Sequence, residues 1–140
     1  MSHRTFKAIS KRAWQHCHQA EVNLLALTGC EWQQQLYYYN QASHELTLQL
    51  ADAGQPLMQE WQLRRWLFNL VRWAIAAQCH WQRQTLLDQL YQPLLALQAL
   101  YRQSPQGAER FSKLQRDLRR LLQPLYQRDS TGPAGPRNRT

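Results

Sequence analysis

The chain has 140 residues and a net charge of +8, and it contains no run of about 18 apolar residues, so we expect no membrane-spanning segment. Its length suits one domain, or one domain and a tail, and can bury a core without disulfides. The polar N-terminus predicts no secretory signal peptide. Three cysteines, Cys17, Cys30 and Cys79, fit a reducing compartment better than a disulfide scaffold, so we expect a cytoplasmic protein.

The first predicted helix covers residues 4–27 and is amphipathic. Gly29 is suited to end it, because glycine readily adopts the left-handed conformation that follows many helices. No Pro or Gly interrupts the helix, and its apolar residues recur at helical intervals at Phe6, Ile9, Ala13, Cys17, Ala20, Leu24 and Leu27.

Residues 31–50 admit two predictions that the sequence leaves open. Helical spacing and the abundance of Gln, Leu, Glu and Ala favour a helix. The run Tyr37–Tyr39 and the alternation over Leu46–Leu50 instead fit a β-hairpin at about 33–50, although its turn would contain no Gly.

Three further helices are predicted over residues 57–84, 85–103 and 108–127. The first is apolar on two neighbouring faces and should be central, with Trp66 and Trp81 in the core. Pro93 predicts a kink or a restart in the second. The inward positions of the third are Phe111, Leu114, Leu118, Leu121 and Leu125.

The overall prediction is a mainly α fold, a bundle of four to five helices forming a single domain over residues 1–127. Residues 128–140 are rich in Gly, Pro and Arg and have no apolar residue larger than alanine. A segment of this composition cannot bury enough apolar surface to order itself, so we expect a disordered basic tail.

Basic and acidic residues are unevenly distributed along the sequence. Residues 1–12 carry four basic residues and no acidic one, and residues 13–63 carry five acidic residues and no basic one. Residues 64–140 carry thirteen basic residues and four acidic ones. Arginine supplies most of the positive charge, and its planar guanidinium suits phosphate and stacks on aromatic rings. The asymmetry indicates a polyanion-binding surface, or association of basic with acidic surfaces.

The stretch EWQLRRWLFNLVRW, residues 60–73, combines three tryptophans with three arginines. Arginine beside an indole can hold a phosphate while the ring stacks on a base. The alternative is ordinary packing, in which tryptophans fill the core and its edge while the arginines extend over them into solvent. The basic helix at 108–127 favours the first interpretation. The candidate nucleic-acid contacts are Arg4, Lys7, Lys11, Arg12, Trp61, Arg64, Arg65, Arg72, Trp73, Arg83, Lys113, Arg116, Arg119 and Arg120.

Metal and catalytic sites are not expected. His16, Cys17 and His18 are adjacent in sequence, as are Cys79 and His80, and neighbours on a helix point about 100° apart. Cys17 and Cys79 also fit apolar stripes, so we expect them to be buried thiols. The acidic residues are scattered, and no phosphate-cradling glycine loop is present. We therefore expect no metal, no cofactor and no enzymatic activity.

The sequence predicts a non-catalytic accessory subunit that binds nucleic acid with low sequence specificity. RNA or single-stranded DNA is favoured over a specific duplex sequence, because no base-reading motif is visible. Other protein subunits of a nucleoprotein complex are expected as partners, and no membrane. The alternative is a protein–protein adaptor or regulator whose basic surface docks an acidic partner or another copy of the chain. In that case Tyr37, Tyr38, Tyr39, Trp61 and Trp73 would be interface anchors.

Overall fold

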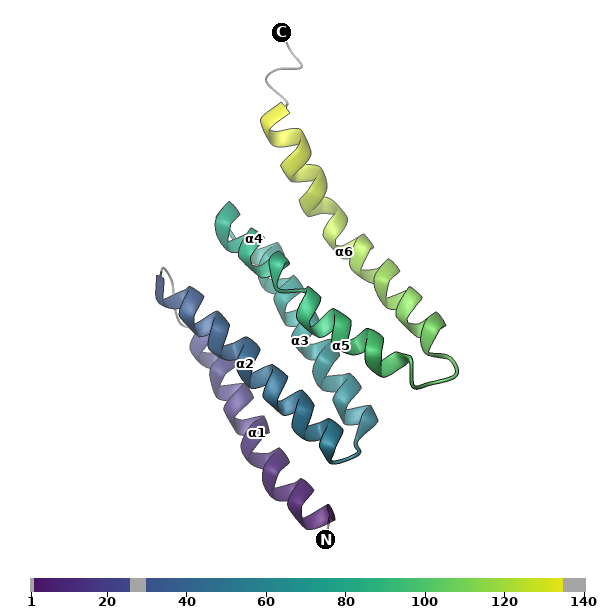
Figure 1. Cartoon of the computed structure of the whole chain (residues 1–140). Helices are drawn as coiled ribbons and strands as arrows, with labels where there is room; N and C mark the ends of the chain where they lie inside the picture. Colours follow the sequence, from purple (N-terminus) through teal and green to yellow (C-terminus); the bar gives the residue numbers. More distant parts are fainter. Residues whose placement is uncertain (1, 26–29, 135–140) are drawn as a thin grey trace. The chain divides into compact units, whose positions relative to one another are not determined.

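A computed structural model describes the backbone of residues 2–25 and 30–134, and the side chains of residues 11–24 and 31–126. The described backbone forms α-helices joined by short connections and contains no strand, so the prediction of a mainly α fold is confirmed (Figure 1). The helices are α1 (Ser2–Leu25), α2 (Cys30–Asp52), α3 (Pro56–Ala76), α4 (His80–Asp88), α5 (Tyr91–Tyr101) and α6 (Gly107–Ala134).

Residues 33–50 lie within α2, so the helix is the alternative that forms and the β-hairpin is not present. Pairs of side chains four residues apart support the helix. Gln34 Nε2 donates to Tyr38 Oη at 3.0 Å, and Gln41 Nε2 donates to Tyr37 Oη at 2.7 Å. Side chains four residues apart are neighbours on the surface of a helix, so these hydrogen bonds are consistent with helical backbone at the tyrosines that had favoured a strand.

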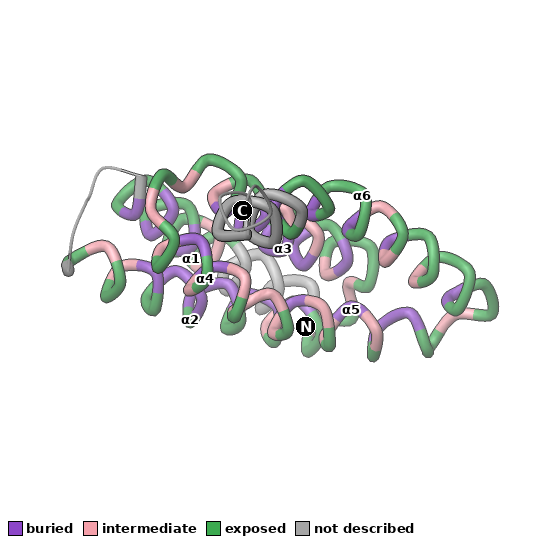
Figure 2. Tube along the Cα trace, turned by 90° about the horizontal axis from the view of Figure 1, so that it is seen from above, coloured by how far each residue is buried: buried purple, intermediate pink, exposed green. Residues whose placement is uncertain are grey.

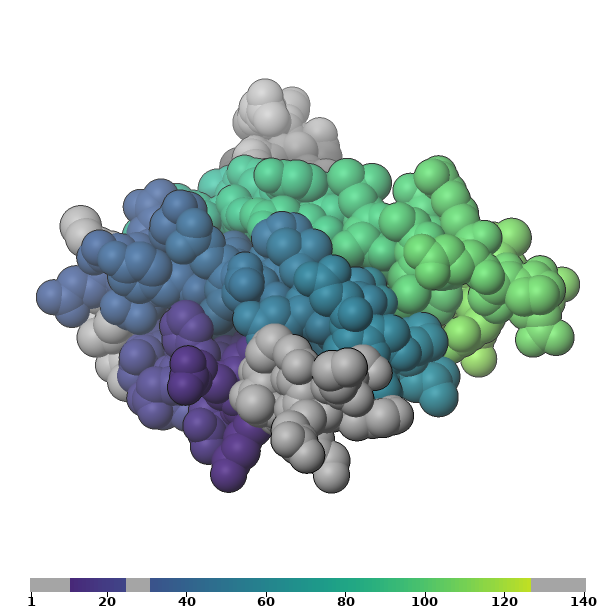
Figure 3. All heavy atoms as spheres, turned by 60° about the horizontal axis from the view of Figure 1, so that its bottom comes forward, coloured from purple at the N-terminus to yellow at the C-terminus, as the bar shows by residue number. Residues whose placement is uncertain are grey.

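The chain divides into two compact units, Met1–Trp66 and Leu67–Thr140, which we call unit 1 and unit 2. The prediction of a single domain over residues 1–127 stays a prediction. In unit 1, α1 and α2 lie side by side (Figures 1 and 3), and the ribbon shows that they are antiparallel (Figure 1). Their core combines side chains from both helices and from the start of α3, namely Ala20, Leu24, Leu36, Leu46, Leu50 and Leu63.

A tight turn connects α2 to α3. Gly54 has a φ of 68°, in the left-handed region that favours glycine, and the N–H of Gln55 donates to the carbonyl of Leu50 at 3.0 Å. These contacts satisfy carbonyls at the end of α2, and Pro56 then occupies the first position of α3, where its missing N–H costs nothing.

The single helix predicted over residues 57–84 is wrong, because α3 ends at Ala76 and α4 begins at His80. No Pro or Gly marks this break. Arg83 lies one turn into α4 and donates from NH2 to the carbonyl of Ala77 at 2.9 Å, which satisfies a carbonyl that the interrupted helix leaves open. The break also turns Trp81 outward: it is 47% exposed, although the uninterrupted helix had placed it in the core.

The second half of unit 2 is a helical hairpin. α5 begins two residues before Pro93, so the predicted restart is confirmed, and Pro93 lies in the first turn, where proline is tolerated. Gly107 begins α6 at a very close approach to the preceding helix: a Cβ at this position would lie 1.5 Å from the carbonyl oxygen of Tyr101. The ring of Tyr101 packs edge-on against Phe111 of α6, with centroids 6.3 Å apart.

Buried and exposed positions alternate along the helices about once per turn (Figure 2). The predicted inward stripe of α6 is confirmed at Leu114, Leu118 and Leu125. It is wrong at Leu121, which is 43% exposed, because its neighbour Leu122 is buried in its place. α6 extends to Ala134 and so includes the start of the segment predicted as a disordered tail, while residues 135–140 lie outside the described residues.

Candidate nucleic-acid interface

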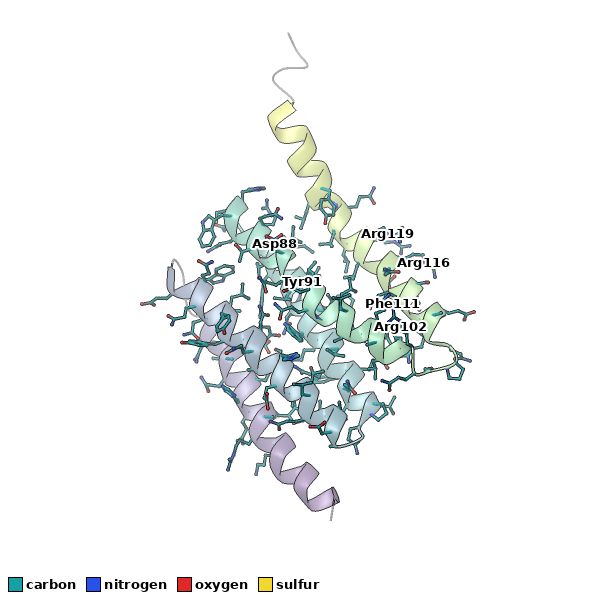
Figure 4. The ribbon with its side chains drawn as sticks, in the orientation of Figure 1. Asp88, Tyr91, Arg102, Phe111, Arg116 and Arg119 are labelled. Atoms are coloured by element: carbon teal, nitrogen blue, oxygen red, sulfur yellow. The ribbon has the colours of Figure 1, made fainter. Side chains whose placement is uncertain are left out.

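The outward face of α6 carries the densest group of exposed basic side chains predicted from the sequence. Lys113, Arg116 and Arg120 follow one another at intervals of three and four residues, so they lie along one line of the helix. Arg119 lies beside this line, one turn from Arg116 (Figure 4), and all four side chains are exposed. We call these four residues the α6 basic face.

This face exists because burial in α6 is confined to one stripe. Leu114, Leu118, Leu122 and Leu125 recur at intervals of three and four residues and pack inward, which leaves the remaining positions to solvent. Few acidic residues dilute the positive charge. Glu109 lies in the first turn of α6, where a carboxylate interacts favourably with the helix dipole, and the side chain of Asp117 is only partly exposed.

Two arginines that were not among the predicted contacts lie at the junction of α5 and α6. Arg102 follows the last residue of α5 and is exposed. Arg110, in the first turn of α6, has its guanidinium carbon 4.8 Å from the centroid of the Tyr101 ring. The sequence Ser104–Gly107 could have indicated them. It predicts a loop that reverses the chain, and such a loop brings the end of one helix close to the basic start of the next.

Unit 1 holds its main arginine differently. Arg65 donates from NH2 to both carboxylate oxygens of Glu21 on α1, at 3.0 and 3.2 Å. Glu21 is 9% exposed, so its carboxylate depends on this partner. The geometry therefore commits Arg65 to a contact within the fold, and a phosphate would have to displace a carboxylate to reach it.

Trp61 is likewise engaged within unit 1. Its ring meets Trp14 of α1 in a T-shaped arrangement with centroids 5.4 Å apart, and the Arg65 guanidinium lies 5.7 Å from the Trp61 centroid. Trp61 is 52% exposed, so part of the ring faces solvent. Trp66, in contrast, is buried and donates from Nε1 to Asn40 Oδ1 at 2.9 Å. Ordinary packing within unit 1 thus accounts for the contacts of Trp61, Arg65 and Trp66.

The other predicted contacts fall into three groups. Lys11 and Arg12 are exposed on α1, whereas the side chains of Arg4 and Lys7 lie outside the described residues. Arg72 is exposed and donates to Asn69 Oδ1 one turn earlier in α3. Arg64 and Trp73 are partly buried.

Arg83 departs from the sequence prediction. It is only 8% exposed and its guanidinium is bonded to the Ala77 carbonyl, so it stabilises the junction of α3 and α4 and does not present a charge to a ligand. The departure follows from the helix break, since an uninterrupted helix would have carried Arg83 along the same side as Arg72.

A small buried polar cluster lies between the helices of unit 1. Cys17 Sγ is 3.5 Å from Ser43 Oγ and accepts a hydrogen bond from Gln62 Nε2 at 3.7 Å. Burial raises the pKa of the Cys17 thiol above its ordinary value of 9.0, and the hydrogen bonds with Ser43 and Gln62 partly offset this increase. A thiol with a raised pKa is a poor nucleophile, so the cluster has the character of a core contact.

The cysteine predictions are confirmed for Cys17, which is buried, but not for Cys79, which is partly exposed and precedes the first residue of α4. The described residues contain no group of three or more His, Cys, Asp or Glu side chains arranged to hold a metal ion. None of the described helices is both long and apolar enough to cross a membrane.

Comparison of the chain with protein-family models, with curated proteins and with solved structures finds no match in any of the three.

Proposed function

We propose that this protein binds single-stranded nucleic acid, RNA or DNA, through unit 2, and that it does so as a non-catalytic accessory subunit. The observation that carries the proposal is the α6 basic face, on which Lys113, Arg116, Arg119 and Arg120 are all exposed within about two turns. Arg102 and Arg110 extend the positive charge to the start of α6.

The spacing of these side chains suits a phosphate backbone. Lys113 and Arg120 are seven residues apart, which is about 10 Å along a helix, and side chains of this length reach phosphates on either side of that span. Their contribution comes from counterion release, which does not depend on base sequence. The proposal is therefore binding with weak sequence preference.

Aromatic stacking, the second part of the predicted mechanism, has better support in unit 2 than in the tryptophan stretch. Tyr126 is 59% exposed and lies on α6 itself, whereas Trp61 already packs against Trp14. Base stacking on an exposed ring contributes roughly 1–3 kcal/mol per base. A tyrosine ring accepts any base, which is consistent with low specificity.

The accessory role is supported by the exposed surface of α2. Tyr37 is 57% and Tyr38 44% exposed, and each is held in place by a glutamine one turn away. Tyrosines fixed in this way are typical interface anchors, so we expect a protein partner at α2. Tyr39 is buried and does not belong to this surface. Among the residues whose side chains are described, Cys17 and Cys79 are free thiols, which suits a cytoplasmic location.

The experiment is fluorescence anisotropy of labelled single-stranded RNA, single-stranded DNA and duplex DNA, titrated with the full chain at several salt concentrations. The proposal predicts saturable binding whose affinity falls steeply with salt and which is tighter for the single strands. If a folded sample binds none of the three ligands at low salt, the proposal is wrong. In that case the adaptor alternative, tested with an acidic peptide, becomes the better account of the α6 basic face.

A further inference from the structure

The outer face of α5 is exposed and carries charge only at its two ends. Tyr91 and Leu95, both 58% exposed, lie one turn apart, and the exposed Ala99 follows one turn later. Asp88, the last residue of α4, precedes them, and Arg102 follows them; both are exposed. We call these five residues the α5 outer face; Figure 4 labels Asp88, Tyr91 and Arg102.

The five residues share one side because the backbone stays helical between α4 and α5. Gln89 and Leu90, which separate the two helices, both have right-handed helical dihedral angles. The N–H of Gln92 donates to the carbonyl of Gln89, and the N–H of Leu94 to that of Leu90, each at 3.2 Å. Intervals of three, four, four and three residues then keep the five side chains within one narrow stripe.

The opposite side of α5 is committed to the core of unit 2. Leu97, Leu100 and Tyr101 are buried there, and Tyr101 packs against Phe111 of α6. The α5 outer face has no such role. A stripe with an exposed leucine and tyrosine at its centre therefore remains on the surface of unit 2.

This stripe is symmetric about Leu95 in a way that matches an antiparallel copy of itself. Asp88 and Arg102 each lie seven residues from Leu95, and Tyr91 and Ala99 each lie four residues from it. In a two-fold antiparallel pair, residues at equal distances from the centre face one another. Each acidic end would then meet a basic end, each large tyrosine a small alanine, and the two leucines would meet at the axis.

We propose that the α5 outer face is the contact surface of a two-fold dimer with a second copy of this chain. The charges identify the occupant: two Asp88–Arg102 pairs form only when the partner carries the same stripe in reverse. Gln84 Nε2 donates to Asp88 Oδ1 at 2.9 Å and so helps to position the carboxylate at the surface. A nucleic acid does not fit, because the centre of the stripe carries no basic side chain and one end is acidic.

The dimer is expected to be weak and reversible. One helix pair buries less surface than the interfaces of stable complexes, so dissociation in the micromolar range is expected. The proposal does not depend on nucleic-acid binding, because dimerisation is measured on the chain alone and its central residue, Leu95, belongs to no proposed nucleic-acid contact. Arg102 is shared with the proposed nucleic-acid surface, and Leu95→Arg tests the dimer without removing it.

The test is sedimentation equilibrium of the full chain from about 1 μM to about 300 μM, a range that brackets a micromolar dissociation constant. The expected result is a concentration-dependent monomer–dimer equilibrium that Leu95→Arg shifts at least about tenfold toward monomer, because it places two cations at the axis. The matched control is Leu48→Arg on α2, where the leucine is 47% exposed and the substitution should leave the equilibrium unchanged. A chain that stays monomeric throughout, or a dimer indifferent to Leu95→Arg, overturns the proposal.

Charge reversal tests the antiparallel geometry and guards against a variant that fails to fold. Asp88→Arg alone and Arg102→Asp alone should each weaken the dimer, because each places like charges opposite one another. The double variant Asp88→Arg/Arg102→Asp should restore it, and an equimolar mixture of the two single variants should form a heterodimer. Failure of both the double variant and the mixture to associate would mean that the two stripes do not pair in reverse.

Discussion

Unit 1 carries six basic and five acidic residues, whereas unit 2 carries eleven basic and four acidic ones. The larger difference lies in how each unit uses them. In unit 1 an arginine reaches across from α3 to a buried carboxylate on α1, and the tryptophan beside it packs against another tryptophan. In unit 2 the basic residues of α6 lie on the side opposite the buried leucine stripe and face solvent.

The comparison shows that a cluster of Trp and Arg in sequence is a poor guide to a binding surface. Both residue types are large and have long apolar portions, so a fold can use them to cover its own core. The amphipathic pattern of α6 is a better indicator of an exposed basic surface. When the leucines of a helix are buried on one side, the basic residues on its other sides are left to face solvent.

The largest effect on stability is expected from Gly107→Ala, which disturbs the start of the helix that carries the α6 basic face. The added Cβ would lie 1.5 Å from the Tyr101 carbonyl oxygen, so α5 and α6 would have to separate. We expect a loss of about 2–4 kcal/mol in the free energy of unfolding, measured by urea denaturation. The control is Gly54→Ala, where no atom lies within 4 Å of the added group and only the positive φ opposes it, at about 1–2 kcal/mol. A Gly107→Ala variant as stable as the parent would contradict this packing.

The second effect concerns the internal charge of unit 1. Arg65→Ala leaves the buried carboxylate of Glu21 without the hydrogen bonds that Arg65 donates, and we expect a loss of about 1–2 kcal/mol, reduced from the value for a fully buried pair because Arg65 is 40% exposed. Thermal and urea unfolding measure it, with Arg12→Ala on the exposed side of α1 as the control. If Arg65→Ala costs no more than Arg12→Ala, the pair does not contribute to the fold and unit 1 resembles unit 2 in leaving its charge to solvent.

The smallest effect is a pH dependence that belongs to unit 1. Burial raises the pKa of Cys17, so above pH 9.0 the unfolded chain ionises this thiol before the folded chain does. Ionisation of the unfolded state favours unfolding, so the stability of the parent should fall relative to Cys17→Ala as the pH rises above 9.0. Urea denaturation of both proteins from neutral to alkaline pH gives the difference. Parallel stability curves would show that folding does not raise the pKa of this thiol.

Most of the helices could be predicted from the sequence because their apolar residues repeat with helical spacing. The stripe of α1 gives buried Cys17, Ala20 and Leu24 as predicted, and α2 is a helix despite its three consecutive tyrosines. The break at Ala77–Cys79 could not be predicted, because nothing in those residues opposes a helix. It is accompanied by a hydrogen bond from Arg83 to the carbonyl of Ala77, which the pattern of apolar residues does not indicate.

The candidate site was predicted in part, and the part that was missed depends on tertiary contacts. The exposure of Lys113 and Arg116 follows from local periodicity, which the sequence contains. The pairing of Arg65 with Glu21 joins residues 44 positions apart, and no local pattern indicates which acidic residue will meet which arginine. The choice of Leu122 over Leu121 as a buried residue is of the same kind, since both positions continue the leucine stripe of α6.

The most direct test of the account compares two variants that each remove three positive charges: Lys113→Gln/Arg116→Gln/Arg120→Gln in α6, and Arg64→Gln/Arg65→Gln/Arg72→Gln in α3. For each, the affinity for single-stranded RNA and DNA is measured against salt concentration by fluorescence anisotropy. The account predicts that the α6 variant binds more weakly, with a slope of log affinity against log salt about two units shallower, while the α3 variant keeps most of the parent's slope. An equal loss in both variants, or a larger loss in the α3 variant, would contradict the assignment of the contacts to α6.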